Sequence, residues 1–261
     1  MKDELAFRLF SRLPLTPPAV RDQIIALSNF GDGLFRPDKC SAFEPIRTPF
    51  EPTDIREPIS WLSKPGGIFM FRKGRPAHFA GVIWNLSRSS DARFPAGPFT
   101  NYWTGGFDGK WAKRVGLEKV EDFLAEMFRV TRSDFGFLTT EIDLRAKNRL
   151  VNSYSYTGMD PITGVPGLYW INLFSDQYAG WFDLGHFPGG LAVLKHFSNG
   201  ALSLKFCDSP EQCRSLEVLQ KQRAAIEWLG AERFFDIGSP DRKAVTPNWA
   251  HLPLPQEQSA G

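Results

Sequence analysis

The pattern of apolar and polar residues is clearest between residues 166 and 206. Leu168 to Phe174 is a short apolar and aromatic run that follows Pro-Gly, which is typical of a buried strand. Two further apolar runs, 191–197 and 201–206, flank the sequence Ser198-Asn199-Gly200. Asn and Gly tolerate the positive φ that a tight primed turn requires, so this arrangement predicts a β-hairpin.

Alternation of apolar and polar residues within the second arm of this hairpin predicts one buried and one solvent-exposed face. Leu202, Leu204 and Phe206 occupy every second position, and Ser203 and Lys205 lie between them. Successive side chains of a strand point to opposite faces, so the three apolar residues should face the core.

Helix signals occur in the first half of the chain. Thr16 followed by Pro17 is typical of an N-cap and a first helical position, and this helix should end near Phe30-Gly31. A second helix is predicted over residues 117–128, because its apolar residues recur at the spacing of one helical face.

A third helix is predicted near the C-terminal end. Ser209 and Gln212 have the spacing of a capping box, and the helix should run to Leu229 and end at Gly230. The side chains expected to face the core are Leu216, Leu219, Ile226 and Leu229, with Trp228 at the margin.

The remaining segments complete a mixed fold. Strands are predicted at 67–72, 77–86 and 135–142, whereas 31–58 is an arm rich in Pro and Phe. The order of elements predicts an α+β fold with a largely antiparallel sheet and helices packed on one face. Its two halves resemble each other in element order, although no sequence repeat accompanies them.

Three parts of the chain are therefore expected. Residues 1–60 hold the N-terminal helix and the arm over the core, residues 61–240 form the α+β core domain, and residues 241–261 form a fraying tail.

Composition places the chain among globular proteins and limits its partners. Hydrophobic residues make up 42% and charged residues 23%, and the net charge of +2 gives no basic block for nucleic acid. Three cysteines are too few for a disulfide framework, which favours reduced thiols. The charged start has no secretion signal, and no apolar run is long enough for a membrane span. We expect a cytoplasmic protein without nucleic-acid or membrane partners.

Sequence motifs for chemistry are sparse. The four histidines (His78, His186, His196 and His251) have no ligand spacing, so no metal is expected, and no cofactor-binding fingerprint is present. Glu141 and Asp143 would face the same way at the end of a strand, as a glycosidase acid and base do, or would simply lie on a solvated strand edge. We expect no catalytic residues, and an enzyme acting on a carbohydrate or small polar substrate through an aromatic cleft remains the alternative.

The stretch 87–116 has a weak pattern, and a loop of this length is either functional or contains short elements. Its rings either fill a second small core or form a docking surface for a protein partner. The residues predicted to bind a partner are Phe94, Phe99, Trp103, Phe107, Asp108 and Trp111.

A family resemblance adds a function to this fold. Leu168 to Phe174, preceded by Pro166-Gly167, resembles the Gly-x-Tyr-Trp-x-Asn-x-Phe-Gly element of bacterial immunity proteins of the polymorphic-toxin and type VI secretion kind. In those families a hairpin and a closing helix that ends near Phe-Phe-Asp follow, and Phe234-Phe235-Asp236 fits that pattern. Ser175 stands where the families have Gly. The likeness covers mainly residues 165–240, with a looser echo in 61–74.

The resemblance implies a protein that binds a cognate toxin and blocks its active site without chemistry of its own. Its motifs are structural, so the Tyr169-Trp170 strand is expected to be scaffold, with recognition elsewhere. A structural or phage-related interaction protein is a further possibility.

Overall fold

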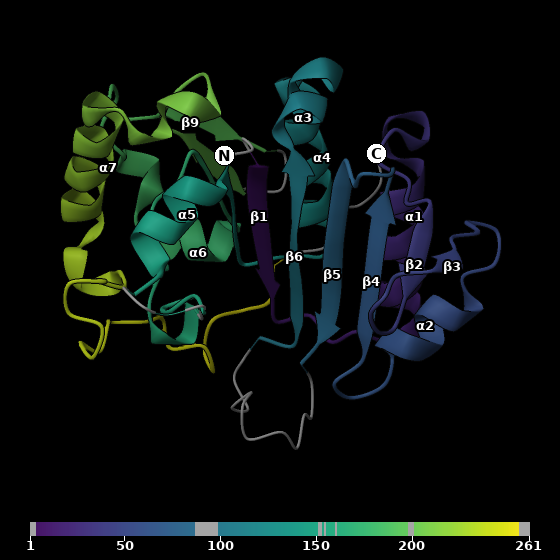
Figure 1. Cartoon of the computed structure of the whole chain (residues 1–261). Helices are drawn as coiled ribbons and strands as arrows, with labels where there is room; N and C mark the ends of the chain where they lie inside the picture. The colour runs from purple at the N-terminus through teal and green to yellow at the C-terminus, as the bar shows by residue number, and fades with distance from the viewer. Residues whose placement is uncertain are drawn as a thin grey trace. The chain divides into compact units, whose positions relative to one another are not determined.

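The computed structural model describes residues 4–86, 99–150, 153, 155–159, 161–197 and 201–255 (Figure 1). The chain divides into two compact units, Met1–Ser133 and Asp134–Gly261. The first unit therefore contains the N-terminal arm together with strands that the sequence assigns to the core. An α+β fold with antiparallel strands and helices packed against them is confirmed.

The first unit is built on antiparallel strands in the order β3-β2-β4-β5-β6-β1. The predicted strands at 67–72 and 77–86 are confirmed as β4 and β5. The strand β1 was not predicted, and the segment 87–116 with its weak pattern contains the strand β6. The bounds are β1 Glu4–Ser11, β2 Lys39–Ser41, β3 Thr48–Pro49, β4 Ile68–Lys73, β5 Phe79–Asn85 and β6 Asn101–Asp108.

The helices of this unit are α1 Pro17–Gly33, α2 Arg56–Leu62, α3 Gly109–Val115 and α4 Leu117–Val130. Thr16 caps α1 as predicted, because its side chain accepts a hydrogen bond from the Ala19 backbone N–H. The backbone leaves the helical conformation at Phe30, where the sequence places the end of the helix. The apolar face of α4 is buried as its spacing predicts.

Aromatic rings fill the space between the helices and the sheet of the first unit. Phe35 stacks on Phe123 of α4 with 4.2 Å between ring centroids, and Phe79 stacks on Phe107 at 4.8 Å. Phe123 meets both of those sheet rings edge-on. These contacts bind α4 to the middle of the sheet, where ring pairs add stability beyond their buried area.

Two glycines allow this aromatic layer to approach the sheet. Gly81 of β5 and Gly105 of β6 are register partners. A Cβ at Gly105 would lie 2.6 Å from Phe7 Cε1 and 2.5 Å from the carbonyl oxygen of Ala80. A Cβ at Gly81 would lie 2.6 Å from Phe71 Cζ. Glycine is needed at both positions because a ring lies directly on the backbone there.

The second unit has antiparallel strands in the order β7-β8-β10-β9. The predicted hairpin is confirmed as β9 and β10, and its predicted turn residues Ser198-Asn199-Gly200 lie outside the described residues. The elements are β7 Phe135–Thr140, α5 Glu141–Asn148, η1 Pro161–Thr163, β8 Ile171–Phe174, α6 Asp176–Trp181, η2 Leu184–His186, β9 Val193–His196, β10 Leu202–Lys205, η3 Pro210–Arg214, α7 Leu216–Leu229 and η4 Ala231–Arg233.

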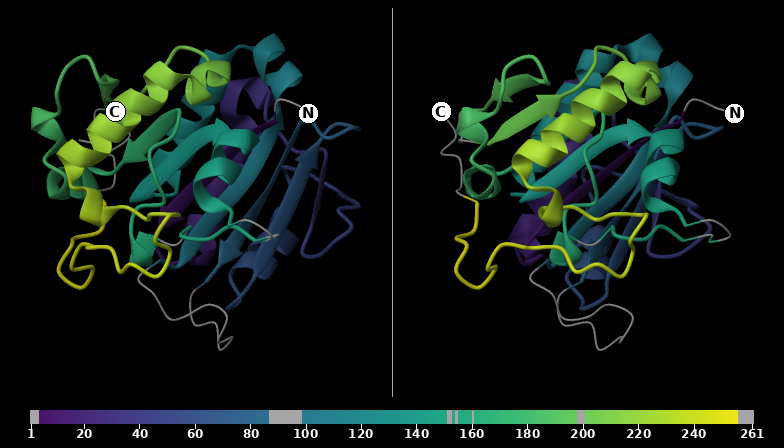
Figure 2. Two further views of the ribbon diagram at one scale, coloured as in Figure 1. Left: turned by 60° about the vertical axis from the view of Figure 1, so that its left-hand side comes forward. Right: turned by 90° about the vertical axis from the view of Figure 1, so that its left-hand side faces the viewer.

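The predictions for the hairpin and the closing helix need three corrections. Of the four α7 residues expected to face the core, Leu229 is buried, whereas Leu219 and Ile226 are half-buried. Leu202, Leu204 and Phe206 are buried as expected, but Ser203 on the other face is buried as well. The capping box at Ser209 opens the short η3 helix, and α7 begins only at residue 216 (Figure 2). The buried positions of α7 are Val218, Gln222, Ala225 and Leu229, whereas Leu216 is 73% exposed.

The C-terminal segment packs on the second unit as far as Trp249. Val245 donates a backbone hydrogen bond to Glu232, and Trp249 stacks on Tyr178 with 5.5 Å between centroids. Residues 256–261 of the expected tail lie outside the described residues.

The two units share an architecture but not a connectivity. In the first, β1 pairs with β6, the last strand of that unit, whereas in the second β7 pairs with β8, the next strand along the chain. The similar halves that the element order suggested therefore differ in strand order. Among the described helices of both units, none is long and apolar enough to cross a membrane.

We predict that Gly105→Ala lowers the free energy of unfolding by about 1–3 kcal/mol, because the new methyl group overpacks against Phe7 and the β5 backbone. Gly180→Ala in α6 is the matched control, since a Cβ there would meet no atom within 4 Å. It should be neutral or stabilise the protein by up to about 1 kcal/mol. Urea unfolding of both variants measures the difference, and equal effects would contradict the role assigned to Gly105.

Candidate functional site

The aromatic stretch of the sequence becomes β6 and α3, and strand geometry divides its side chains between two faces. Trp103 and Phe107 point into the core beneath α1 and α4, where the Trp103 indole Nε1 donates to Gln23 Oε1 at 3.1 Å. Tyr102 and Thr104 alternate with them and point to the opposite face. Both of these outward side chains are half-buried.

This opposite face of the first unit, here called the open face, carries three rows of side chains. Among the described residues of the unit, no helix covers it, because α1 and α4 lie behind the strands (Figure 1). Nearly all of its side chains are half-buried, and those of Phe10 and Ala6 are buried. Across the register the rows are Ile68–Trp84–Tyr102–Phe10, Met70–Val82–Thr104–Arg8 and Arg72–Ala80–Gly106–Ala6.

The first row gives the open face its aromatic character. Tyr102 lies beside Phe10 with 5.0 Å between ring centroids, and Trp84 is its register partner on the other side. The Arg8 guanidinium lies 5.7 Å from the centroid of the Tyr102 ring. Trp, Tyr and Arg are the side chains most enriched where proteins bind each other, so their combination here is typical of an interface.

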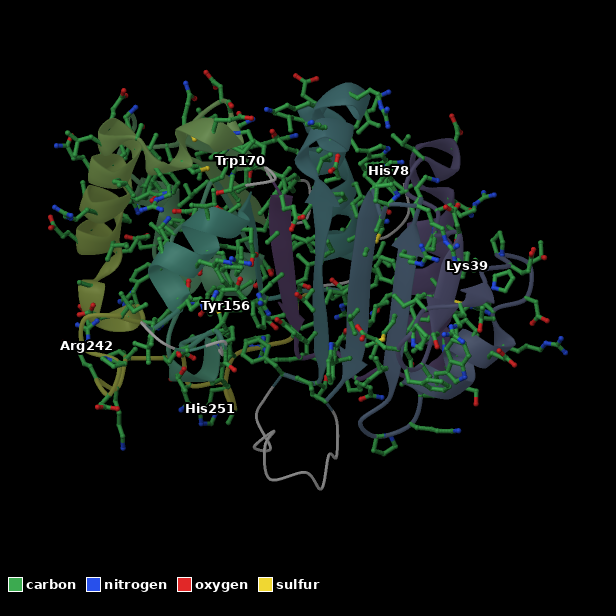
Figure 3. All side chains as sticks on the ribbon, in the orientation of Figure 1. Lys39, His78, Tyr156, Trp170, Arg242 and His251 are labelled. Carbon is green, nitrogen blue, oxygen red and sulfur yellow. The ribbon has the colours of Figure 1, made fainter. Side chains whose placement is uncertain are left out.

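The three rows of the open face carry two cations, Arg8 and Arg72, and the next row along β1 and β6 pairs the carboxylates Glu4 and Asp108. Arg72 and Lys39 are register partners, so Lys39 extends the third row towards the β2 edge (Figure 3). Arg72 donates to the carbonyl oxygens of Ile46 and Gly74, and Lys39 donates to that of Arg47. These carbonyl oxygens carry no formal charge, so both cations remain available to a carboxylate of a partner.

The structure relocates most of the six residues predicted to bind a partner. Phe94 lies outside the described residues. Asp108 caps α3 by accepting from the Trp111 backbone N–H at 2.8 Å. The other four side chains are at most 5% exposed and belong to the interior, so they are not surface anchors in this conformation: Phe99, Trp103, Phe107 and Trp111. Among the described rings of this stretch, that of Tyr102 points to the outer face.

The prediction that Glu141 and Asp143 lie on a strand and face the same way is wrong. The strand β7 ends at Thr140, and both carboxylates lie in the first turn of α5, where Thr140 caps the helix. Each is held by a different set of partners. Glu141 binds Arg145 at 2.9 Å and accepts from the Tyr156 hydroxyl, whereas Asp143 is buried and accepts from Thr139 at 2.7 Å. Side chains on separate sides of one turn do not form a shared acid–base site.

Asp143 belongs to a buried polar network around Lys147. The ammonium donates to Asp143 Oδ2 at 2.8 Å, to the Leu168 carbonyl oxygen at 2.7 Å and to Gln222 Oε1 at 2.9 Å. Burial lowers the pKa of Lys147, and the Asp143 carboxylate opposes that shift. The network connects α5, α7 and the segment before β8, and it explains why the polar Gln222 occupies a core position of α7.

The same segment shows what the Tyr-Trp-x-Asn motif does. Asn172 accepts from the Tyr169 backbone N–H at 2.9 Å and donates to the Tyr169 carbonyl oxygen at 3.0 Å. The Tyr169 hydroxyl donates to Asn148 of α5, and the Trp170 indole donates to the Cys207 carbonyl oxygen at 2.8 Å. The Trp170 and Asn172 side chains therefore bind backbone and that of Tyr169 binds the Asn148 side chain, all within the second unit, and all three are buried.

Two of the four histidines, His78 and His186, contact side chains of their own unit. His78 stacks on Trp111 with 6.2 Å between centroids, and His186 Nδ1 lies 2.8 Å from Asp183 Oδ1. Within the part of the chain that the structure describes, no three His, Cys, Asp or Glu side chains gather as ligands would.

A hollow of about 460 Å³ lies beside α2 in the first unit. Its carboxylates include Asp54, whose pKa the Arg56 guanidinium lowers to about 2. This pair neutralises itself at the rim, and the remaining wall residues are mostly apolar or exposed: Cys40, Thr48, Pro49, Phe50, Glu51, Glu57 and Pro58.

Comparison with known proteins gives one informative likeness. No protein-family model matches the chain, and no curated protein matches it. Among solved structures, the chain is similar to the Pseudomonas aeruginosa T6SS protein PA0821, with 11% sequence identity and a TM-score of 0.54. The match covers 95% of this chain and 88% of that chain. At this identity the likeness shows a shared fold.

We predict that Lys147→Ala lowers the free energy of unfolding by about 3–5 kcal/mol, because it leaves the buried Asp143 carboxylate without its cation. The control is Arg145→Ala, two residues earlier in the same helix and half exposed, which should change stability by at most about 0.5 kcal/mol. Denaturant unfolding compares the two, and a Lys147 variant as stable as the control would contradict the structural role of the network.

Proposed function

We propose that this protein is an immunity protein, which binds a cognate bacterial toxin in the cytoplasm and neutralises it without catalysis. The observation that carries the proposal is the shared fold with a protein named for the type VI secretion system, which extends over 95% of the chain. The Tyr169-Trp170-x-Asn172 element supports it independently, because it resembles the immunity families at the sequence level.

Binding rather than chemistry is supported by the state of the acidic side chains. Asp143 is committed to a buried ion pair, and Glu141 is committed to Arg145 and Tyr156. A general acid or base needs access to its substrate and a pKa near the working pH. Both groups are instead used to fix α5 against its surroundings.

The open face is the surface that we assign to the toxin. It offers the half-buried Trp84 and Tyr102 rings as anchors and Arg8, Arg72 and Lys39 as charged partners. The complementary surface of a toxin would be apolar in the middle and would carry Asp or Glu at its edge. A toxin inactivated in this way is blocked by a rigid sheet face and needs no rearrangement of the protein that binds it.

The direct test is co-expression of this chain with the toxins encoded beside its gene, with cell growth as the measurement. Protection by the chain together with a stable complex of the two purified proteins would support the proposal. The absence of any toxin or secretion gene in the neighbourhood, combined with no protection, would overturn it.

The open face makes a separate prediction. Trp84→Ala and Thr104→Arg should each weaken toxin binding by about 10-fold or more, because one removes an anchor ring and the other places bulk in the middle row. Trp228→Ala is the matched control: this ring is 39% exposed on α7 of the second unit, and its loss should leave the dissociation constant nearly unchanged. Calorimetric titration measures all three.

Thermal unfolding of the same variants shows whether they remain folded. If both open-face variants bind as the unchanged protein does and the Trp228 variant does not, the toxin binds the second unit. That result would contradict the open face as the binding surface. It would leave the proposed immunity function intact, because the growth experiment tests that function separately.

A further inference from the structure

The strand β9 forms the outer edge of the sheet in the second unit. It is the last strand in the order β7-β8-β10-β9, so it is paired on one side only, with β10. The backbone N–H and C=O groups on the unpaired side of an edge strand are a template for a further strand. The register between β9 and β10 shows which residues supply those groups.

The outward backbone groups belong to Leu194 and His196. The Phe197 N–H donates to the Ala201 carbonyl oxygen at 2.8 Å, and this pair is in register with the rest of the β9–β10 ladder. Hydrogen-bonded pairs alternate with non-bonded pairs in an antiparallel ladder, so the N–H and C=O groups of residues 194 and 196 point away from β10. In the described ranges of the chain, neither residue has a hydrogen-bond partner on that side.

The side chains at this edge are accessible as well. Val193 is 64% exposed, and Lys195 and His196 are also exposed. Val193 and Lys195 lie on the same face of the strand because they are two residues apart. Both side chains would therefore lie directly beside the side chains of any segment that pairs with β9.

The charge around the edge is positive. From Leu184 to Phe206 the sequence contains two lysines, Lys195 and Lys205, and no Asp, Glu or Arg. Lys205 is the register partner of Val193, so both lysines lie on the same face of the hairpin as that valine. Pairing of β9 with a second copy of itself would gather these like charges at the junction, whereas a strand with carboxylates would neutralise them.

The edge strand of the first unit has protection that β9 does not have. The strand β3 consists only of Thr48–Pro49, and a proline has no N–H to offer to a further strand. Short length and proline both protect a sheet edge from pairing. By contrast, β9 has four residues and no proline, and its protective residue is Lys195, whose charge an acidic strand would neutralise.

We propose that the β9 edge binds an extended, acidic segment of another protein, which pairs with β9 as an additional strand. The backbone of the segment bonds to the outward groups of Leu194 and His196. On the other face of the strand, the segment places an apolar residue beside Val193 and a carboxylate beside Lys195. The recognised segment therefore has Asp or Glu two positions away from a branched apolar residue. This surface belongs to the second unit, so the proposal is independent of toxin binding at the open face.

The probe is a capped synthetic peptide of the sequence Thr-Val-Thr-Glu-Thr-Val-Thr, which is titrated into the full-length protein while the backbone amide signals are followed by nuclear magnetic resonance. We expect the signals of residues 193–197 to shift, and added salt to weaken the binding. The same peptide with Lys in place of Glu should bind about 5-fold more weakly or worse, because it places a like charge beside Lys195.

Methylated peptides test whether the contact is a strand pairing. The nitrogens of the Thr residues and those of the Val and Glu residues form two alternate sets, of which only one faces β9. Methylation of that set should abolish binding, and methylation of the other set should leave it unchanged. A peptide that merely adheres to the surface would not distinguish the two sets.

His196→Pro tests the same contact from the side of the protein. The variant lacks the outward N–H but keeps the ladder with β10, and it should bind the acidic peptide about 5-fold more weakly or worse. His196→Ala keeps the N–H and is the matched control, with a dissociation constant within about 2-fold of that of the unchanged protein. Lys195→Glu should reverse the preference between the Glu and the Lys peptide.

Absence of shifts in the amide signals of β9, or equal binding of the two methylated peptides, would overturn the proposal. A chain that is dimeric in solution and becomes monomeric with His196→Pro would also overturn it, since the edge would then bind a second copy. The peptide titrations use the unchanged protein, so a variant that folds poorly leaves the test intact.

Discussion

The open face and the core of the first unit are set by a single constraint, which is that neighbouring residues of a strand point to opposite sides. In β6 this constraint sends Trp103 and Phe107 under the helices and Tyr102 and Thr104 away from them. The close approach of Phe7 at Gly105 keeps the inner side tightly packed. One strand of a sequence rich in rings thereby supplies both the core and the candidate binding surface.

Two strands of the first unit, β1 and β6, could not be predicted from the sequence. The stretch 87–116 is unusually rich in rings, but its sequence does not reveal the register of β6. A shift of that register by one residue would exchange the inner and the outer rings. In β1 the buried Leu5, Phe7 and Leu9 occupy every second position, but Ala6 and Phe10 on the other face are apolar as well, so the alternation that marks a strand is weak there. Helices with strong local signals, such as the Thr16 cap and the apolar face of α4, were predictable because those signals are local.

The second unit shows why some local patterns misled. Thr140 followed three residues later by Asp143 is an N-terminal helix signal, and it overrides the strand that the preceding residues continue. In α7 the buried face includes Gln222 rather than Leu216, because Gln222 accepts from the buried Lys147. A polar partner from a distant segment decides that position, and no property of the helix alone reveals it.

If the open face binds the toxin as proposed, family resemblance and recognition lie in different units. The Tyr169, Trp170 and Asn172 side chains that carry the resemblance make hydrogen bonds inside the second unit. Such residues constrain the fold whatever the protein binds, so they persist as a motif among proteins with different partners. The residues of a surface such as the open face determine which partner binds and do not determine the fold. They can therefore differ between proteins that share this fold.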